Sequence, residues 1–248
     1  MSIFAALNIY HDICPRSAAM NMAIDEALLE SVAAPSIRFY RWESPALSFG
    51  YFSRFADVAD QASERDLVRR WTGGGIVFHG EDLTYSIVIP RSDPVFSKLS
   101  GAVYAAIHGA LRNALVANGE CAELLAVAAV CDRRTCFPSN NFPTADGSTQ
   151  NSATVTDRRY NDCFANPVRA DVTIDGRKVA GAAQRRTRGG LLQQGSVQYV
   201  ELGNGLAERF VRALSANCSE RKIAGEILNR ASKLARQKYK SDAWLRRR

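Results

Sequence analysis

Residues 69–79 read RRWTGGGIVFH, and this segment carries more information than any other part of the chain. Its consecutive glycines, Gly73, Gly74 and Gly75, leave a short piece of backbone without side chains, so it can adopt positive φ and approach a ligand closely. Two arginines precede the glycines, and His79 follows them. Turn chemistry alone favours a tight turn between two strands, whereas bare amides beside cations also suit an acyl or phosphate oxygen.

The composition is that of an ordinary globular protein. Of the 248 residues, 46% are hydrophobic and 23% are charged, and this length suits one large domain or one domain with a small appendage. No apolar run approaches the length of a membrane span, and the N-terminus lacks the basic region of a secretory signal. We therefore expect a cytoplasmic protein that does not enter a membrane.

The positive charge of the chain is concentrated at one end. The net charge is +7, and residues 207–248 alone carry twelve Lys and Arg against four Asp and Glu. Such a basic segment can dock an acidic protein partner or a nucleic acid. No RNP, zinc-finger or helix-turn-helix pattern accompanies it, so we do not expect nucleic-acid binding.

The cysteine pattern argues against a metal site. Six cysteines are scattered through the chain with no Cys-x-x-Cys pair: Cys14, Cys121, Cys131, Cys136, Cys163 and Cys218. No histidine lies near Cys131 and Cys136, whose spacing does not suit zinc. Reduced thiols are the expected state in a cytosolic protein.

Hydrophobic periodicity in the first half of the chain predicts helices and strands. Residues 17–33 show helical spacing, with Ser17 at the position of an N-cap. Strands are expected at 37–42, 46–52 and 83–89. The four-residue spacing of apolar side chains over 95–118 predicts a long helix.

The second half begins with a change of character. Residues 131–162 are rich in Ser, Thr, Asn and Pro without a hydrophobic period, which predicts a long surface loop. Asp175-Gly176 is a strong hairpin signal, followed by strands at 178–184 and 191–200, and the pattern is helical from 206 onward. Strands with helices between and after them indicate an α/β or α+β sheet with helices on one face.

Cys163 lies where the predicted loop re-enters the sheet, and a thiol there can be both accessible and held. A nearby cation lowers the pKa of a cysteine from about 8.5 to between about 3.5 and 7.5, which makes it nucleophilic. Lys178 follows fifteen residues later, just past the predicted turn, and can return to that neighbourhood. Against this, an isolated cysteine is more often a small core residue, and a hairpin lysine is more often solvated.

The three histidines differ in their surroundings. His79 follows the glycines and can act as a base or donate a hydrogen bond to an oxygen, although a single histidine after a strand is more often structural. His11 and His108 have no chemical neighbours in the sequence. We expect His108, on the long helix, to be structural.

Six segments in this order resemble the biotin/lipoate protein ligase superfamily, and within it the lipoate branch of lipoate–protein ligases and cysteine-dependent octanoyltransferases. They are Asn21–Leu29, Arg38–Trp42, Leu47–Phe52, Arg69–His79, Leu83–Ser86 and Gly176–Gln184. The closing residues 238–244 also match the way in which that branch ends. The resemblance covers most of the chain, except for an insert at about 121–160.

The resemblance implies the catalytic-domain fold of that superfamily. This is an α/β (α+β) domain in which a mixed, largely antiparallel sheet is flanked by helices. The catalytic domain would span 1–205, with the insert at its surface, and a basic helical C-terminal tail at 206–248 would pack on it. A monomer is the expected state.

The resemblance also implies the site. Cys163 and Lys178 would be catalytic, the cysteine holding the acyl group as a thioester and the lysine lowering the pKa of the thiol. Residues expected to bind the acyl group or an acyl adenylate are Arg70, Gly73, Gly74, Gly75, His79, Gly181 and Ala183. Amides of the glycine segment can stabilise an oxyanion during acyl transfer. No protein-bound metal is expected.

Features of both activities of the branch are present in the chain. Cys163-Phe164 and Leu83–Ser86 resemble the octanoyltransferases. Gly75 resembles the ATP-dependent ligases, because the transferases often have Arg at this third glycine. Asn161-Asp162 also resembles the ligases, which usually lack a catalytic cysteine.

The leading hypothesis is therefore an octanoyl- or lipoyltransferase without a cofactor, which takes its acyl group from acyl carrier protein. The acceptor would be a lysine of a lipoyl carrier domain, in a 2-oxoacid dehydrogenase E2 subunit or the glycine cleavage H protein. The alternative is an ATP-dependent lipoate ligase that acts through lipoyl-AMP and needs ATP and Mg²⁺. A third option is a non-catalytic protein that binds lipoyl domains.

Overall fold

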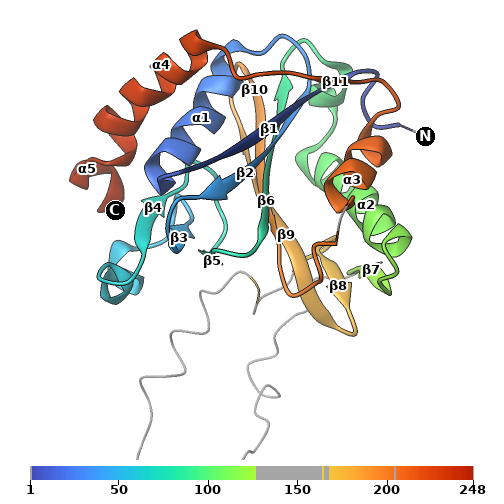
Figure 1. Ribbon diagram of the computed structural model, residues 1–248, viewed down its shortest axis with the longest axis horizontal. Coiled ribbons are helices and arrows are strands. Elements are labelled where there is room, and N and C mark those ends of the chain that lie inside the picture. Colours follow the sequence, from blue (N-terminus) through green and yellow to red (C-terminus); the bar gives the residue numbers. More distant parts are fainter. Residues whose placement is uncertain (1, 127–163, 165–167, 204, 248) are drawn as a thin grey trace, which may run out of the picture.

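The computed structural model describes residues 2–126, 164, 168–203 and 205–247 (Figure 1). Cys131, Cys136 and Cys163 lie outside the described residues, as does most of the segment 121–160 that the sequence singles out as an insert. The remaining chain forms one large sheet, one small sheet and helices packed against them.

The large sheet has eight strands in the order β11-β1-β2-β6-β10-β9-β8-β7. Their bounds are β1 Leu7–Arg16, β2 Ser36–Trp42, β6 Leu83–Pro90, β7 Ala122–Leu124, β8 Val172–Ile174, β9 Arg177–Arg186, β10 Gly190–Val197 and β11 Cys218–Glu220. Strand β1 pairs in parallel with β2 and β11, and the other neighbours pair antiparallel. The predicted mixed, largely antiparallel sheet is therefore confirmed.

A separate small sheet carries the glycine segment. Its order is β4-β3-β5, with bounds β4 Asp66–Arg69, β3 Ala46–Phe49 and β5 Ile76–His79. The glycines thus connect the two outer strands of this sheet, each of which pairs with β3. The segment joins two strands as predicted, but it crosses the sheet from one edge to the other and is not the predicted tight turn.

Helices cover both faces of the large sheet (Figure 1). Helices α1 Ala18–Ser31 and α4 Gly225–Leu234 share one hydrophobic core with Tyr40 and Trp42 of β2. Helices α2 Ser100–Ala117 and α3 Leu206–Leu214 share another core with Ile37 and Phe39 of the same strand. Alternate residues of a strand point to opposite faces, so the prediction of helices on one face was wrong.

Helix α1 begins where the sequence predicts, but its cap differs. The Ser17 side chain makes no capping hydrogen bond. Instead, the Ala18 amide donates to Oδ2 of Asp66 at 2.7 Å, a residue at the start of β4. A carboxylate is well placed at the positive end of a helix, so this contact joins α1 to the small sheet.

The predicted hairpin is confirmed, and the predicted long helix begins later than expected. Asp175 and Gly176 both have positive φ, 49° and 76°, as a two-residue turn between β8 and β9 requires. In place of a helix from 95, a 3-10 turn at Pro94–Ser97 precedes α2. Gly119 follows the end of α2 with φ of 97°, which a residue with a side chain rarely adopts.

The C-terminal segment is part of the fold rather than a separate layer. It adds strand β11 to the large sheet and continues through α4, a π-helical turn at Ala235–Tyr239 and α5 Asp242–Leu245. The sequence predicts its helices but not its strand. No helix in the described part of the chain is long and apolar enough to cross a membrane.

Candidate active site

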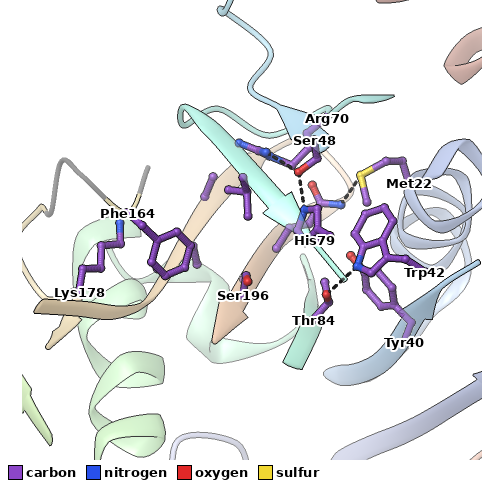
Figure 2. A pocket seen from close by; sticks show the side chains of 16 residues that line it. Met22, Tyr40, Trp42, Ser48, Arg70, His79, Thr84, Phe164, Lys178 and Ser196 are labelled. Carbon is purple, nitrogen blue, oxygen red and sulfur yellow. Dashed lines mark hydrogen bonds between the residues drawn. The ribbon is translucent and has the colours of Figure 1, made fainter. Parts of the chain in front are cut away.

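One pocket opens between the two sheets and is shown from close by in Figure 2. Its wall is mostly apolar and comes from α1, β2, the small sheet, β6, β9 and β10. The lining residues are Met22, Tyr40, Trp42, Ser48, Arg70, Val77, His79, Thr84, Phe164, Lys178, Gly181, Ala182, Ala183, Gln194, Gly195 and Ser196. Four of the residues predicted to bind the acyl group are among them, namely Arg70, His79, Gly181 and Ala183.

The pocket has two chemically different ends. Figure 2 shows Lys178 and Phe164 together at one end, with Trp42 and His79 at the other. The Lys178 Nζ lies 5.5 Å from the centroid of the Phe164 ring. An elongated apolar space with a cation at one end suits a fatty chain with a polar head.

Lys178 is buried although it belongs to a hairpin strand. Only 6% of the residue is exposed. The pairing of β8 with β9 shifts register here, since Val172 faces Ala180 whereas Thr173 faces Lys178. A β-bulge of this kind re-aims side chains, which explains why simple alternation does not place this lysine in solvent.

Gly181 provides the space that the Lys178 side chain occupies. A Cβ built on Gly181 would lie 2.4 Å from Cε and 2.6 Å from Nζ of the lysine. Only glycine allows this approach of the ammonium to the strand. The glycine three residues after the lysine is therefore a requirement of the site.

The charge of Lys178 is met by a buried carboxylate. Its Nζ lies 2.8 Å from Oδ2 of Asp171, whose side chain is fully buried. The other carboxylate oxygen, Oδ1, accepts from the Tyr104 hydroxyl at 2.5 Å. Burial raises the pKa of Tyr104, and the negative charge of Asp171 raises it further, so the hydroxyl remains protonated and donates.

His79 belongs to a hydrogen-bonded row at the far end of the pocket. Its Nδ1 lies 2.8 Å from Oδ2 of Asp82, and its Nε2 lies 2.7 Å from Oγ of Ser48. Arg70 donates to the same Oγ at 2.7 Å. Because arginine only donates, the Ser48 hydroxyl accepts from Arg70 and has its own proton left for Nε2.

The surroundings of this row fix its geometry. The imidazole stacks on the Trp42 indole with ring centroids 4.1 Å apart. Burial alone would raise the pKa of Asp82, but His79 and the hydroxyls of Thr84 and Ser196 stabilise its charge and hold that pKa below its ordinary value. His79 is thus a firmly held polar group in an apolar wall.

Arg70 donates hydrogen bonds to carbonyl groups of the glycine segment. Its guanidinium donates to the carbonyls of Gly73 at 3.0 Å and Gly75 at 2.8 Å. Gly74 has φ of 83°, and Gly50 packs against it so closely that an added Cβ would lie 1.8 Å from the Gly74 oxygen. The glycine segment thus fixes the Arg70 guanidinium through its carbonyl groups. Gly73, Gly74 and Gly75 are not among the residues that line the pocket.

A buried polar network lies behind the pocket. Gln194 donates to Asp25 at 2.7 Å and accepts from Thr72 at 2.8 Å, so it joins α1 to the glycine segment. Arg38, whose side chain is fully buried, pairs with Asp25 at 2.8 Å and Asp12 at 2.7 Å. Fully paired buried networks of this kind rigidify a site.

His108 has chemical neighbours that the sequence did not reveal. Its Nδ1 lies 2.7 Å from the Ala170 carbonyl, and its ring centroid lies 4.1 Å from that of Tyr104. Burial lowers the pKa of His108 to about 4. The ring is therefore neutral near pH 7 and lies behind the Tyr104–Asp171 pair.

Sequence reasoning missed several members of the site. Asp171, Tyr104, Ser48, Asp82 and Gln194 were not singled out. Asp82 lies three residues after His79, a spacing that could have suggested a pair. Nothing in the sequence connects Tyr104 with Asp171, because they are 67 residues apart.

The chain matches the family model described as the lipoyl protein ligase A/B catalytic domain over residues 17–237. It belongs to that family. The resemblance inferred from the six sequence segments is thereby confirmed.

The described residues hold no group of three or more His, Cys, Asp or Glu side chains that could bind a metal ion.

Curated relatives match at about one third identity. The chain is 35% identical over 192 residues to the octanoyltransferase LipM of Oceanobacillus iheyensis, covering 74% of this chain and 60% of the relative. The octanoyltransferase LipM of Geobacillus kaustophilus is 34% identical over 192 residues, with 74% and 62% covered. The chain thus spans about three fifths of the length of these relatives.

Solved structures share the fold. A crystal structure of lipoate-protein ligase A bound with ATP superimposes with a TM-score of 0.69 at 19% identity, covering 96% of this chain and 97% of the other. Protein Ta0514 of T. acidophilum, described as a putative lipoate protein ligase, with bound lipoic acid, gives a TM-score of 0.68 at 19% identity with the same coverage. The predicted catalytic-domain fold is confirmed.

Proposed function

We propose that this protein is an octanoyltransferase of protein lipoylation that carries the acyl group as a thioester on Cys163. One observation carries the proposal: Phe164, the next residue after Cys163, lines an apolar pocket beside Lys178. Cys163 itself lies outside the described residues, and it enters the proposal as the residue that directly precedes Phe164 in the sequence. Curated relatives at 33–35% identity are named octanoyltransferase.

The chemistry divides one acyl transfer into two. The Cys163 thiolate attacks the thioester carbonyl of an octanoylated carrier protein, the bond between the carbonyl carbon and the carrier sulfur breaks, and the carrier leaves as a thiolate that takes a proton from solvent. The ε-amine of an acceptor lysine then attacks the enzyme thioester, the amide forms with loss of an amine proton to solvent, and the Cys163 sulfur leaves as a thiolate. The Lys178 ammonium favours the thiolate in both steps and stabilises the developing negative charge.

The pocket supports this assignment of roles. The octanoyl chain would occupy the apolar space that extends from Lys178 to Trp42 and Met22, with its carbonyl at the lysine end. Acyl carrier protein is the proposed donor, and a lipoyl carrier domain of an E2 subunit or the H protein is the proposed acceptor. No cofactor is required for this reaction, and the cytoplasm is the proposed location.

The experiment compares the wild type with Cys163→Ser under two sets of reagents. With octanoyl acyl carrier protein and a lipoyl domain, we expect the wild type to transfer octanoate without ATP. We expect Cys163→Ser to lose this transfer, and Cys14→Ser, which changes an exposed thiol, to retain it. Transfer that persists in Cys163→Ser contradicts the thioester mechanism.

Two other activities give different results. A lipoate ligase would modify the lipoyl domain with free lipoate, ATP and Mg²⁺, and would do so equally well in Cys163→Ser. A non-catalytic binder would bind the lipoyl domain and modify it under neither condition. Mass spectrometry of the acceptor domain distinguishes the three.

A further inference from the structure

We infer that Asp171, held by Tyr104, positions the Lys178 ammonium at one end of the pocket. Asp171 is a positioning residue, because its own carboxylate is fully buried and does not line the pocket. The inference rests on the proposed transfer reaction and adds to it the carboxylate that fixes the position of the Lys178 ammonium.

The need for such a partner follows from burial. Only 5% of the Lys178 side chain is exposed, and its wall is largely apolar. An isolated ammonium in such a place favours losing its proton, because burial disfavours the charged form. The carboxylate 2.8 Å away is the charge that offsets this loss of solvation.

Asp171 is fixed at both of its oxygens. Oδ2 accepts from the Val168 amide at 2.7 Å as well as from Lys178. Oδ1 accepts from the Tyr104 hydroxyl, which in turn accepts from the Ala182 amide at 3.1 Å. Tyr104 therefore ties the carboxylate to strand β9, the strand that also carries Lys178.

Two further titratable groups near this cluster, Tyr85 and His108, do not compete for the carboxylate. Burial raises the pKa of Tyr85, so its hydroxyl stays neutral. His108 packs beside Tyr104 from the next turn of α2, with the two rings tilted by 50°, and directs Nδ1 to the Ala170 carbonyl. Being neutral near pH 7, it adds no second cation. Among the described residues, the cation that pairs with Asp171 is therefore Lys178.

A second cluster, with a glutamate in place of the aspartate, serves as a control. Glu26 accepts from Lys238 at 2.7 Å and from the Tyr239 hydroxyl at 2.5 Å, in the core between α1 and the C-terminal segment. It too is a buried carboxylate between a lysine and a tyrosine, but none of its three members lines the pocket. Changes there measure the loss of a buried ion pair alone.

The test measures octanoyl transfer by the full chain and the alkylation of Cys163 against pH. In Asp171→Asn we expect kcat to fall about 100-fold with KM changed little, since misplacing a catalytic group by about 1 Å has this size of effect. We expect half-maximal alkylation of the Cys163 peptide by iodoacetamide, followed by mass spectrometry, at higher pH than in the wild type.

Asp171→Glu and Tyr104→Phe complete the series. The glutamate retains the charge, so the alkylation profile should return toward that of the wild type even where kcat stays low. Tyr104→Phe should lower kcat about 10-fold, since loosening the carboxylate misplaces the ammonium less than removing its charge does.

Glu26→Gln should lower thermal stability and leave both pH profiles unchanged. If Asp171→Asn changes only thermal stability, as Glu26→Gln does, the positioning role is wrong. If Cys163→Ser still transfers octanoate, the proposed function itself is wrong, whatever Asp171 does.

Discussion

Gly181 sets how closely the Lys178 side chain can approach strand β9. Any side chain at this position would occupy the space now taken by Cε and Nζ. The obstructed atoms belong to the far end of a flexible side chain, so the protein can respond by moving the lysine rather than by unfolding. The effect of a substitution here is therefore expected in activity more than in stability.

Gly181→Ala tests this separation of function from folding. We expect at least about a 100-fold loss of octanoyl transfer, because the ammonium is displaced, with a change in the free energy of unfolding below about 1 kcal/mol. Gly101→Ala is the matched control, since nothing lies within 4 Å of a Cβ added there. Equal activity of both variants would contradict the role given to Gly181.

At the scale of single residues, the sequence predicted identities better than contacts. Lys178, Gly181, Ala183, Arg70 and His79 all line the pocket, and their roles in catalysis and acyl binding stay predictions. The role of the glycines was less predictable. A run of glycines indicates exposed backbone, but it does not say whether the amides or the carbonyls of that backbone contact a neighbouring side chain. Here the carbonyls of Gly73 and Gly75 face Arg70.

Arg69 joins the small sheet to the C-terminal helix. Its side chain is fully buried and donates to the carbonyls of Trp244 at 3.0 Å, Leu245 at 2.9 Å and Arg247 at 2.8 Å. These carbonyls lie at the negative end of α5, where a cation is favoured. The indole of Trp244 returns a hydrogen bond to the Arg69 carbonyl at 3.0 Å.

Removing residues 242–248 tests this connection between elements. The truncation removes these carbonyl partners of the Arg69 guanidinium, and a hydrogen bond to a charged group contributes about 1.5–3 kcal/mol. We therefore expect the free energy of unfolding in urea to fall by about 3 kcal/mol or more. A truncated chain as stable as the full chain would show that α5 does not hold the small sheet.

Elements with local signals were predictable, and elements that depend on distant partners were not. The Asp175-Gly176 turn is encoded in two residues and was found. Strand β11 has only three residues and exists because it pairs with β1, more than 200 residues earlier. The bulge at Lys178 likewise depends on the register of β8 and has no signal of its own.

At the scale of the whole molecule, the fold class followed from alternation and order, whereas the placement of helices did not. Strand β2 is buried on both faces except at Arg41, as expected for a strand that helices cover on both sides. Apolar side chains stand on both of its faces, Ile37 and Phe39 on one and Tyr40 and Trp42 on the other, and this pattern argues against helices on one face alone. The two cores meet at this sheet, and the pocket opens at its border with the small sheet.

His108 makes the stability of the molecule depend on pH. Its pKa of about 4 in the folded state is below the ordinary 6.5, so the unfolded chain binds the proton first. Stability is then lost as the pH falls below 6.5, by about 2 kcal/mol between pH 7 and pH 5 for this group. In His108→Asn, the free energy of unfolding in urea should therefore fall by about 2 kcal/mol less between pH 7 and pH 5 than it does in the wild type. An identical slope in both proteins would contradict the assignment.

The thioester on Cys163 is the central claim, and the mass of the enzyme tests it most directly. The protein is mixed with octanoyl acyl carrier protein without an acceptor, quenched in acid and digested. We expect one octanoyl group on the peptide that contains Cys163, removed by hydroxylamine and discharged when a lipoyl domain is added. An enzyme that modifies the lipoyl domain while this peptide stays unmodified at every time point would contradict the account.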